Sequence, residues 1–268
     1  MRPGTEVHVY EDMTNTTTGS FEVGDEVYGC VGGFKGTPGV LAEYALADSR
    51  LLAPKPPPLT MREAAAIPLI GITAWNALID RGELTKGQRV LIHAGTGGVG
   101  HIALQLAKAM GAEVHTTIST KHKADLAQHL GADRVINYSQ TSPKQYVQEF
   151  TNGFGYDLVF DTVGGTCLDH SFEAAKEYGT VVSIAARANH DLSQVHVKSL
   201  SLHVVFINLI DAKFESIDIT DCAPLEINSN EIFPVPVNKS RTSKPSMSIE
   251  CSSTLNKPSL AKSVVGRE

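Results

Sequence analysis

Between residues 89 and 207, short runs of apolar residues alternate with segments in which apolar residues recur every three or four positions. The short runs predict buried strands, and the longer period predicts amphipathic helices. The predicted strands are 89–93, 113–118, 134–137, 157–161, 180–184 and 200–207, and the predicted helices are 99–110, 121–130, 143–151 and 168–176. Such regular alternation predicts an α/β fold with a doubly wound parallel sheet.

A glycine-rich turn joins the first predicted strand to the first helix. It consists of Gly95, Thr96, Gly97, Gly98, Val99 and Gly100 and fits the pattern G-x-G-x-x-G. In such turns the first glycine allows the tight turn, the second lets a pyrophosphate approach the backbone, and the third allows close helix packing. The N–H groups at the helix start then attract the negative charge. A flexible glycine loop is the alternative, but the flanking strand and helix favour a dinucleotide phosphate site.

The chain divides into three parts by composition. Residues 1–58 contain short β-rich pieces separated by turn residues and predict part of a β-barrel, which a proline-rich connector at 54–58 ends. Thr60 and Glu63 have the spacing of a capping box at the start of a helix. The alternating region covers 59–209. In 210–268 Ser, Pro, Asn and Lys dominate without any period, which predicts a disordered tail.

The charge and cysteine content narrow the function classes. The formal net charge is −6, and no stripe of basic residues interleaved with aromatics occurs, so we expect neither a nucleic-acid nor a membrane partner. The 4 cysteines form no C-x-x-C pair, which indicates reduced thiols in a cytoplasmic protein. Cys167 and His170 lie three apart and provide only half a metal site, so we predict no zinc.

Several ordered motifs resemble one family, the medium-chain dehydrogenase/reductases, and within it the zinc-free quinone oxidoreductases related to zeta-crystallin. The motifs are 24–28 (GDEVY), 39–44 (GVLAEY), 64–75 (AAAIPLIGITAW), 87–108, 131–133 (GAD), 137–138 (NY) and 161–165 (DTVGG). The resemblance implies a Rossmann NAD(P)-binding domain over 59–209 and a partial GroES-like catalytic domain over 1–58. We therefore expect a chain truncated at both ends of the catalytic domain.

The cofactor is predicted from the end of the second strand. This end, residues 117–120, carries no carboxylate to hold a ribose 2′-hydroxyl, and Lys121 and Lys123 follow. The resemblance implies that Ser119, Lys123 and Tyr138 surround a 2′-phosphate, so NADPH is expected and NADH is less favoured. A solvent-exposed helix start is the other interpretation of the two lysines.

The resemblance also implies where the nicotinamide lies. Thr162, Val163, Ile184 and Phe206 would border the nicotinamide and its ribose, and Thr73 would lie near the reacting ring as the candidate catalytic hydroxyl. The alternative is that Thr73 positions or packs its neighbours and that the apolar residues are core.

These observations together predict NADPH-dependent reduction of a quinone or an α,β-unsaturated carbonyl by hydride transfer. Two alternatives remain: a nucleotide-binding remnant with little turnover, and a fragment of a zinc-dependent alcohol dehydrogenase. The resemblance further implies a homodimer formed through the edge of the sheet at 200–207.

Overall fold

The computed structural model describes residues 8–11, 21–22, 24–32, 39–40, 45, 47, 49–206 and 248–251. The chain divides into two compact units, which are described separately. The first comprises Met1–Leu69, Ile207–Thr220 and Ile227–Glu268, and the second comprises Ile70–Phe206 and Asp221–Glu226. The domain boundaries predicted at 58/59 and 209/210 stay predictions.

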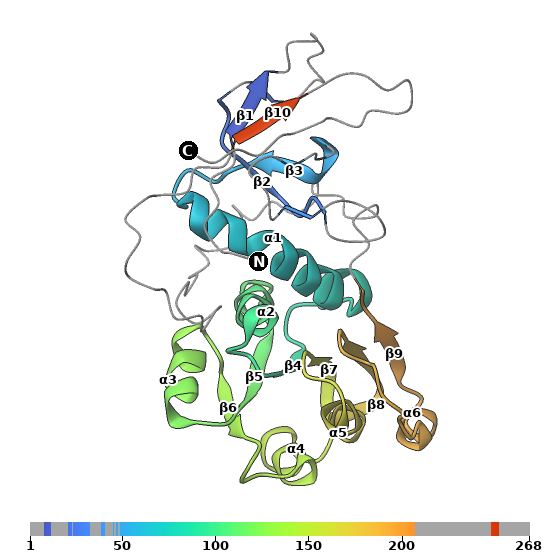
Figure 1. The fold of residues 1–268 in the computed structure, drawn as a ribbon. Coiled ribbons are helices and arrows are strands. Elements are labelled where there is room, and N and C mark those ends of the chain that lie inside the picture. Colours follow the sequence, from blue (N-terminus) through green and yellow to red (C-terminus); the bar gives the residue numbers. More distant parts are fainter. Residues whose placement is uncertain are drawn as a thin grey trace. The chain divides into compact units, whose positions relative to one another are not determined.

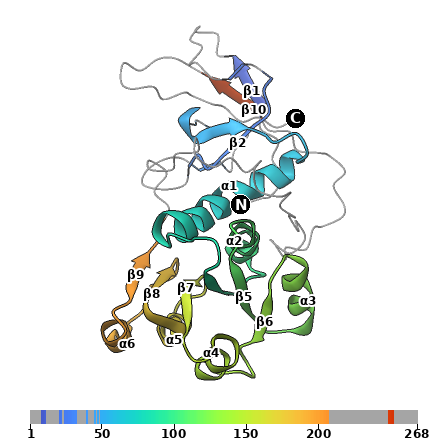
Figure 2. The ribbon, with the colours of Figure 1, turned by 180° about the vertical axis from the view of Figure 1, so that it is seen from behind.

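The second unit is built on a six-stranded sheet in which every neighbouring pair is parallel (Figure 1). Its strands are β4 (Arg89–His93), β5 (Glu113–Ile118), β6 (Arg134–Asn137), β7 (Tyr156–Asp161), β8 (Ala175–Ser183) and β9 (Ser201–Val204). Their order is β6-β5-β4-β7-β8-β9. Strands β5 and β6 are therefore added on one side of β4, and β7, β8 and β9 on the other, so the strand order reverses between β4 and β7. Seen from behind, β6 and β9 form the two edges (Figure 2). The predicted doubly wound parallel sheet is confirmed.

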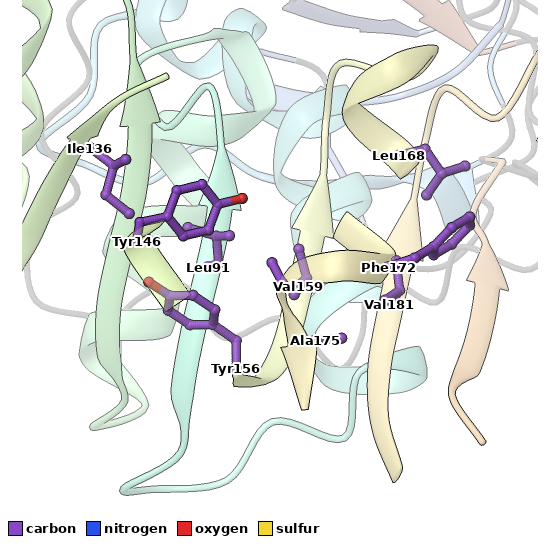
Figure 3. Packing of buried hydrophobic residues seen from close by; sticks show 10 residues of the cluster. Leu91, Ile136, Tyr146, Tyr156, Val159, Leu168, Phe172, Ala175 and Val181 are labelled. Carbon is purple, nitrogen blue, oxygen red and sulfur yellow. The ribbon is translucent and has the colours of Figure 1, made fainter. Parts of the chain in front are cut away.

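Helices connect these strands. They are α2 (Gly98–Ala109), α3 (Lys121–His129), α4 (Pro143–Thr151), α5 (Thr166–Ala174) and α6 (Ser193–Val197). One core cluster lies between the sheet and the helices α4 and α5, where Leu91 and Val159 of the central strands meet Tyr146 and Phe172 (Figure 3). Burial of such side chains contributes about 1.5–3 kcal/mol each and fixes the sheet as a rigid support for its strand ends.

The structure differs from the sequence prediction at several boundaries. The predicted helix 168–176 ends at Ala174, because Ala175 is already extended (φ −66°, ψ 144°) and opens β8 five residues before the predicted start. The last strand ends at Val204. The π-helical segment Asn76–Arg81 and the short α6 were not predicted.

The described part of the first unit contains short elements. β2 (Val27–Gly29) pairs antiparallel with β3 (Leu52–Pro54), the 3-10 helix Ser49–Leu51 precedes β3, and β1 (His8–Glu11) pairs parallel with β10 (Ser248–Cys251). A larger barrel remains a prediction. Apart from the strand β10, the tail predicted to be disordered lies outside the described residues.

The predicted capping box is present at the start of α1 (Met61–Trp75). The Thr60 N–H donates to the Glu63 carboxylate (2.9 Å), and the Glu63 N–H donates to the Thr60 hydroxyl (3.3 Å). These bonds satisfy N–H groups that a helix start leaves without internal partners.

Candidate cofactor site

The turn between β4 and α2 is closed by backbone geometry at Ala94. The Gly97 N–H donates to the Ala94 carbonyl (2.8 Å), and Ala94 has the left-handed φ of +53°. The tight turn predicted at Gly95 is present, and the residue with the left-handed conformation is Ala94, immediately before it. Gly95 is required for another reason: a Cβ there would overlap the Thr116 hydroxyl of β5.

Thr116 links this turn to the neighbouring strand. Its buried hydroxyl accepts from the Gly95 N–H (2.9 Å) and donates to the Ile92 carbonyl (2.7 Å). The Gly95 N–H is therefore used within the protein, and the phosphate-binding groups must lie further along the turn.

The remaining glycines differ in the space around them. A Cβ on Gly100 would overlap the carbonyl oxygen of Ala94, the residue that follows β4, so this glycine allows α2 to pack closely on the end of the strand. A Cβ on Gly97 would lie 3.1 Å from the same oxygen, whereas Gly98 has no atom within 4 Å of the Cβ position. Gly98 thus marks the open side of the turn.

The start of α2 lacks a side-chain cap. Gly97 is the N-cap residue, and the first helical hydrogen bond runs from the His101 N–H to the Gly97 carbonyl (3.0 Å). The N–H groups of Gly98, Val99 and Gly100 precede this bond, and Gly98 itself is exposed. An uncapped helix start beside a residue without a side chain fits a pyrophosphate, because the N–H groups and the helix dipole attract an anion.

Ser119 and Tyr138 follow two neighbouring strands. Ile118 of β5 pairs with Asn137 of β6, and the Tyr138 N–H donates to the Ile118 carbonyl (3.2 Å). Ser119 and Tyr138 therefore lie at adjacent strand ends, and the Tyr138 side chain is 59% exposed.

Lys123 lies on the first turn of the next helix, α3. Its N–H donates to the hydroxyl of Thr120, the N-cap residue of that helix (3.3 Å), and its side chain is exposed. The register thus brings Ser119 and Tyr138 together at the strand ends, with Lys123 four positions beyond Ser119. Their contact with a 2′-phosphate stays a prediction.

Asp161, the last residue of β7, organises the next strand end. Its fully buried carboxylate accepts hydrogen bonds from the Val163 N–H (3.0 Å), the Gly164 N–H (2.9 Å) and the Ser183 hydroxyl (2.7 Å). Neither Asp161 nor Ser183 was among the predicted site residues. The available signal was a carboxylate directly after the buried apolar run Leu158–Phe160.

Hydroxyl groups also join β4 to both of its neighbours. The Thr162 hydroxyl donates to the His93 carbonyl (2.7 Å), and the Thr117 hydroxyl accepts from the Ala94 N–H (3.2 Å) and lies 3.1 Å from His93 Nδ1. Burial lowers the pKa of His93 to about 4, with the nearby Asp161 acting in the opposite direction. The imidazole is therefore neutral near pH 7.

The other predicted nicotinamide residues follow the carboxyl ends of β7, β8 and β9. Val163 follows β7 and is 53% exposed, Ile184 follows β8, and Phe206 comes two residues after β9 and is 60% exposed. Thr73 lies on α1 and is buried. Their functional roles stay predictions.

Among the described residues, no group of three or more His, Cys, Asp or Glu side chains could hold a metal ion. Burial raises the pKa of the Cys167 thiol, and the neighbouring Asp161 raises it further, so this thiol is a poor ligand in its present environment. Within the same part of the chain, no helix is long and apolar enough to cross a membrane.

The parallel sheet, the reversal of strand order and the uncapped glycine turn at that point define a dinucleotide-binding α/β protein of the Rossmann class. The family described as Zinc-binding dehydrogenase matches residues 98–218. The quinone oxidoreductase from Coxiella burnetii is 31% identical, with a TM-score of 0.65, and the match covers 80% of this chain and 68% of that one. This chain belongs to the medium-chain dehydrogenase/reductase family of oxidoreductases, whose members bind NAD(P)H.

Two further relatives show how much of the longer proteins is matched. An alcohol dehydrogenase superfamily protein from Novosphingobium aromaticivorans is 46% identical, with a TM-score of 0.68, over 70% of this chain and 56% of that one. The spectinabilin polyketide synthase system protein NorB of Streptomyces orinoci is 34% identical over 194 residues, which are 71% of this chain and 9% of NorB.

Proposed function

We propose that this chain reduces a quinone or another α,β-unsaturated carbonyl compound with NADPH. The observation that carries the proposal is the open, uncapped start of α2 at Gly98, which fits a dinucleotide pyrophosphate. The substrate class is supported by the likeness to the Coxiella burnetii quinone oxidoreductase. A quinone is itself a conjugated carbonyl compound, so both substrates present the same kind of electrophile.

The preference for NADPH rests on charge at the end of β5. Residues 117–124 carry no carboxylate, whereas the exposed Lys123 amine lies on the first turn of α3. A carboxylate at this strand end would favour the 2′-hydroxyl of NADH and repel a 2′-phosphate. The Ser119 and Tyr138 hydroxyls would donate hydrogen bonds to the same phosphate, and the lysine would add a charge-assisted one.

When bound, NADPH would supply a hydride from its nicotinamide ring. The protein's own residues bind and orient: the N–H groups of Gly98–Gly100 hold the pyrophosphate, and Val163 and Ile184 border the ring at the strand ends. The Thr73 hydroxyl is the candidate donor to the substrate carbonyl oxygen. It would polarise the carbonyl group as the conjugated β-carbon accepts the hydride, and a proton from solvent would then complete the reduction at the α-carbon.

A negative charge introduced at the glycine turn tests the proposal. Gly98→Asp introduces a side chain where no atom lies within 4 Å, and an acid in the first turn of a helix is favourable for the helix itself. We expect the variant to keep the wild-type melting temperature and to lose NADPH binding in a fluorescence titration. Unchanged NADPH affinity would show that the glycine turn is not the phosphate site.

Single-turnover oxidation of NADPH by a simple quinone then separates an enzyme from a nucleotide-binding remnant. We expect quinone-dependent oxidation in the wild type and none in Gly98→Asp. Binding without oxidation would favour the remnant.

Zinc content tests the metal-free part of the proposal. Mass spectrometry of the purified protein is expected to show substoichiometric zinc. A stoichiometric zinc ion would favour the zinc-dependent alcohol dehydrogenase instead.

Two further parts of the proposal concern assembly and location. The edge strand β9 ends with Val204, which is 61% exposed, and Phe206 beyond it is 60% exposed, so we propose a homodimer through this edge. Sedimentation as a monomer would contradict the homodimer.

A cytoplasmic location, proposed from the widely spaced cysteines, is tested by cell fractionation.

A further inference from the structure

We propose that the Asp161 carboxylate and the Ser183 hydroxyl act as a positioning pair that holds the two strand-end loops at the nicotinamide half of the cofactor site. The inference rests on the proposed function, because it assigns the nicotinamide to the ends of β7 and β8. Neither residue is expected to touch the cofactor. Their role is to fix the backbone that does.

The first part of the argument is the direction of the bonds made by Asp161. This fully buried carboxylate accepts from two successive backbone N–H groups, those of Val163 and Gly164, at 3.0 and 2.9 Å. Two bonds to one side chain constrain both peptide groups at once. The carboxylate therefore sets the orientation of the peptide planes after β7, which the exposed Val163 side chain cannot do.

Ser183 extends this control to the neighbouring loop. Asp161 and Ser183 are paired across β7 and β8, and the Ser183 hydroxyl donates to the carboxylate (2.7 Å) while it accepts from the Ala185 N–H (3.2 Å). The Ile184 N–H donates to the Asp161 backbone carbonyl (3.2 Å). The Asp161 carboxylate thus orders the loop that follows β7 directly and the loop that follows β8 through Ser183.

The two loops also touch directly. Gly164 has the left-handed φ of +78°, and a Cβ there would overlap the Ala185 carbonyl oxygen. A small rotation of either loop would therefore displace the other. Because a misplacement of about 1 Å can lower a rate about a hundredfold, geometry set by buried groups here would control reactivity.

Ser183→Ala is the main test, with Ser171→Ala as the matched control. Both serines are fully buried, and the Ser171 hydroxyl donates within α5, to the Cys167 carbonyl (2.9 Å), rather than to a strand-end loop. The probes are NADPH and 2′,5′-ADP, which contains the adenosine half of the cofactor and no nicotinamide.

We expect Ser183→Ala to keep its affinity for 2′,5′-ADP, to weaken NADPH binding about fivefold and to lower kcat about tenfold or more. Ser171→Ala should change none of the three. Equal loss of NADPH and 2′,5′-ADP binding, or the same losses in both variants, would overturn the proposal in favour of a general structural role. Unchanged NADPH affinity and kcat in Ser183→Ala would overturn it as well.

Amide hydrogen exchange measured by NMR tests the positioning without any ligand. The amides of Val163, Gly164 and Ala185 should exchange faster in Ser183→Ala than in Ser171→Ala, with unchanged exchange at the glycine turn. Equal exchange in the two variants would contradict the pair.

Asp161→Asn is the second variant. It keeps the side-chain volume and one acceptor oxygen but places an amide toward two or more donors, so its effects should exceed those of Ser183→Ala. If the wild type binds neither 2′,5′-ADP nor NADPH, the proposed function is wrong and the cofactor role of the pair falls with it. If it binds AMP and NADH instead, only the 2′-phosphate preference fails, and the same comparison with those ligands decides the role of the pair.

Discussion

The two ends of the six-stranded sheet are held by different chemistry. At the carboxyl end, buried groups such as Thr116, Asp161 and Ser183 bond to the backbone of the loops that follow the strands. At the amino end, partly exposed charged side chains form ion pairs and also bond to strand backbone: Arg89 Nε lies 2.9 Å from Glu113, Lys176 pairs with Asp157, and the Arg89 N–H donates to the Asp157 carboxylate (2.7 Å).

The two ends of the sheet therefore differ in what their side chains control, which is loop conformation at the carboxyl end and mainly the free energy of unfolding at the amino end. Partly exposed ion pairs contribute about 0–1 kcal/mol each to stability. Buried hydroxyl and carboxylate groups that bond to backbone instead determine where each loop lies. We therefore expect substitutions at the carboxyl end to change ligand binding and those at the amino end to change mainly the free energy of unfolding.

The largest expected effect comes from Gly100→Ala, which disturbs the turn at the carboxyl end of β4. The added methyl group would overlap the Ala94 carbonyl, and the turn would have to move. We expect a loss of about 3 kcal/mol in the free energy of unfolding and loss of NADPH binding. Urea denaturation and titration measure both, and Gly98→Ala, where space is open, should keep its stability.

Acidification should weaken the fold through its buried histidines. The pKa of His93 is lowered to about 4, so between pH 6.5 and about 4 the unfolded chain takes up a proton that the folded one does not, and stability falls as pH falls. Each pH unit in this window costs about 1.4 kcal/mol. Asp161 and His170 are the charged or titratable groups that act on His93.

His115 at the amino end should contribute in the same direction. Burial lowers its pKa, and its two nitrogens lie 2.9 Å from the Tyr156 hydroxyl and 3.0 Å from Glu113. Urea midpoints measured from pH 7 to 4 test the effect. His93→Asn, which retains a polar atom toward Thr117, should flatten the pH dependence, and an equally steep curve in this variant would contradict the assignment.

A smaller effect is expected from Lys123→Glu at the end of β5. The reversed charge should raise the Kd for NADPH about tenfold, which is about 1.4 kcal/mol, and leave the Kd for NADH nearly unchanged. Titration with both cofactors measures the ratio. Lys144→Glu, an equally exposed change in the first turn of α4, serves as the control. A parallel loss for both cofactors would argue against a 2′-phosphate contact.

The smallest effect is expected at the amino end. Glu113→Gln removes the charge that faces Arg89 and keeps an acceptor near His115. We expect a loss of about 0.5–1 kcal/mol in stability without any change in NADPH affinity. A changed NADPH affinity would break the comparison between the two ends.

The fold could be predicted from the sequence because strand and helix periods alternate strongly from Arg89 onward. The glycine turn was located correctly, but the contact that requires a glycine at position 95 is with Thr116, 21 positions away, and no local pattern shows it. The positions of Asp161 and Ser183 were visible, but their pairing depends on the register between β7 and β8. Local patterns predict elements; contacts between distant strand ends require the assembled sheet.

The strand order also has a consequence for synthesis on the ribosome. β4, β5 and β6 are contiguous along the chain, so this half of the sheet can pair once Asn137 has emerged. Val90 of β4 must then wait for Leu158 of β7, its partner across the reversal point. Until that strand emerges, the growing chain exposes the unpaired backbone groups on one side of β4, an edge that could pair with another chain.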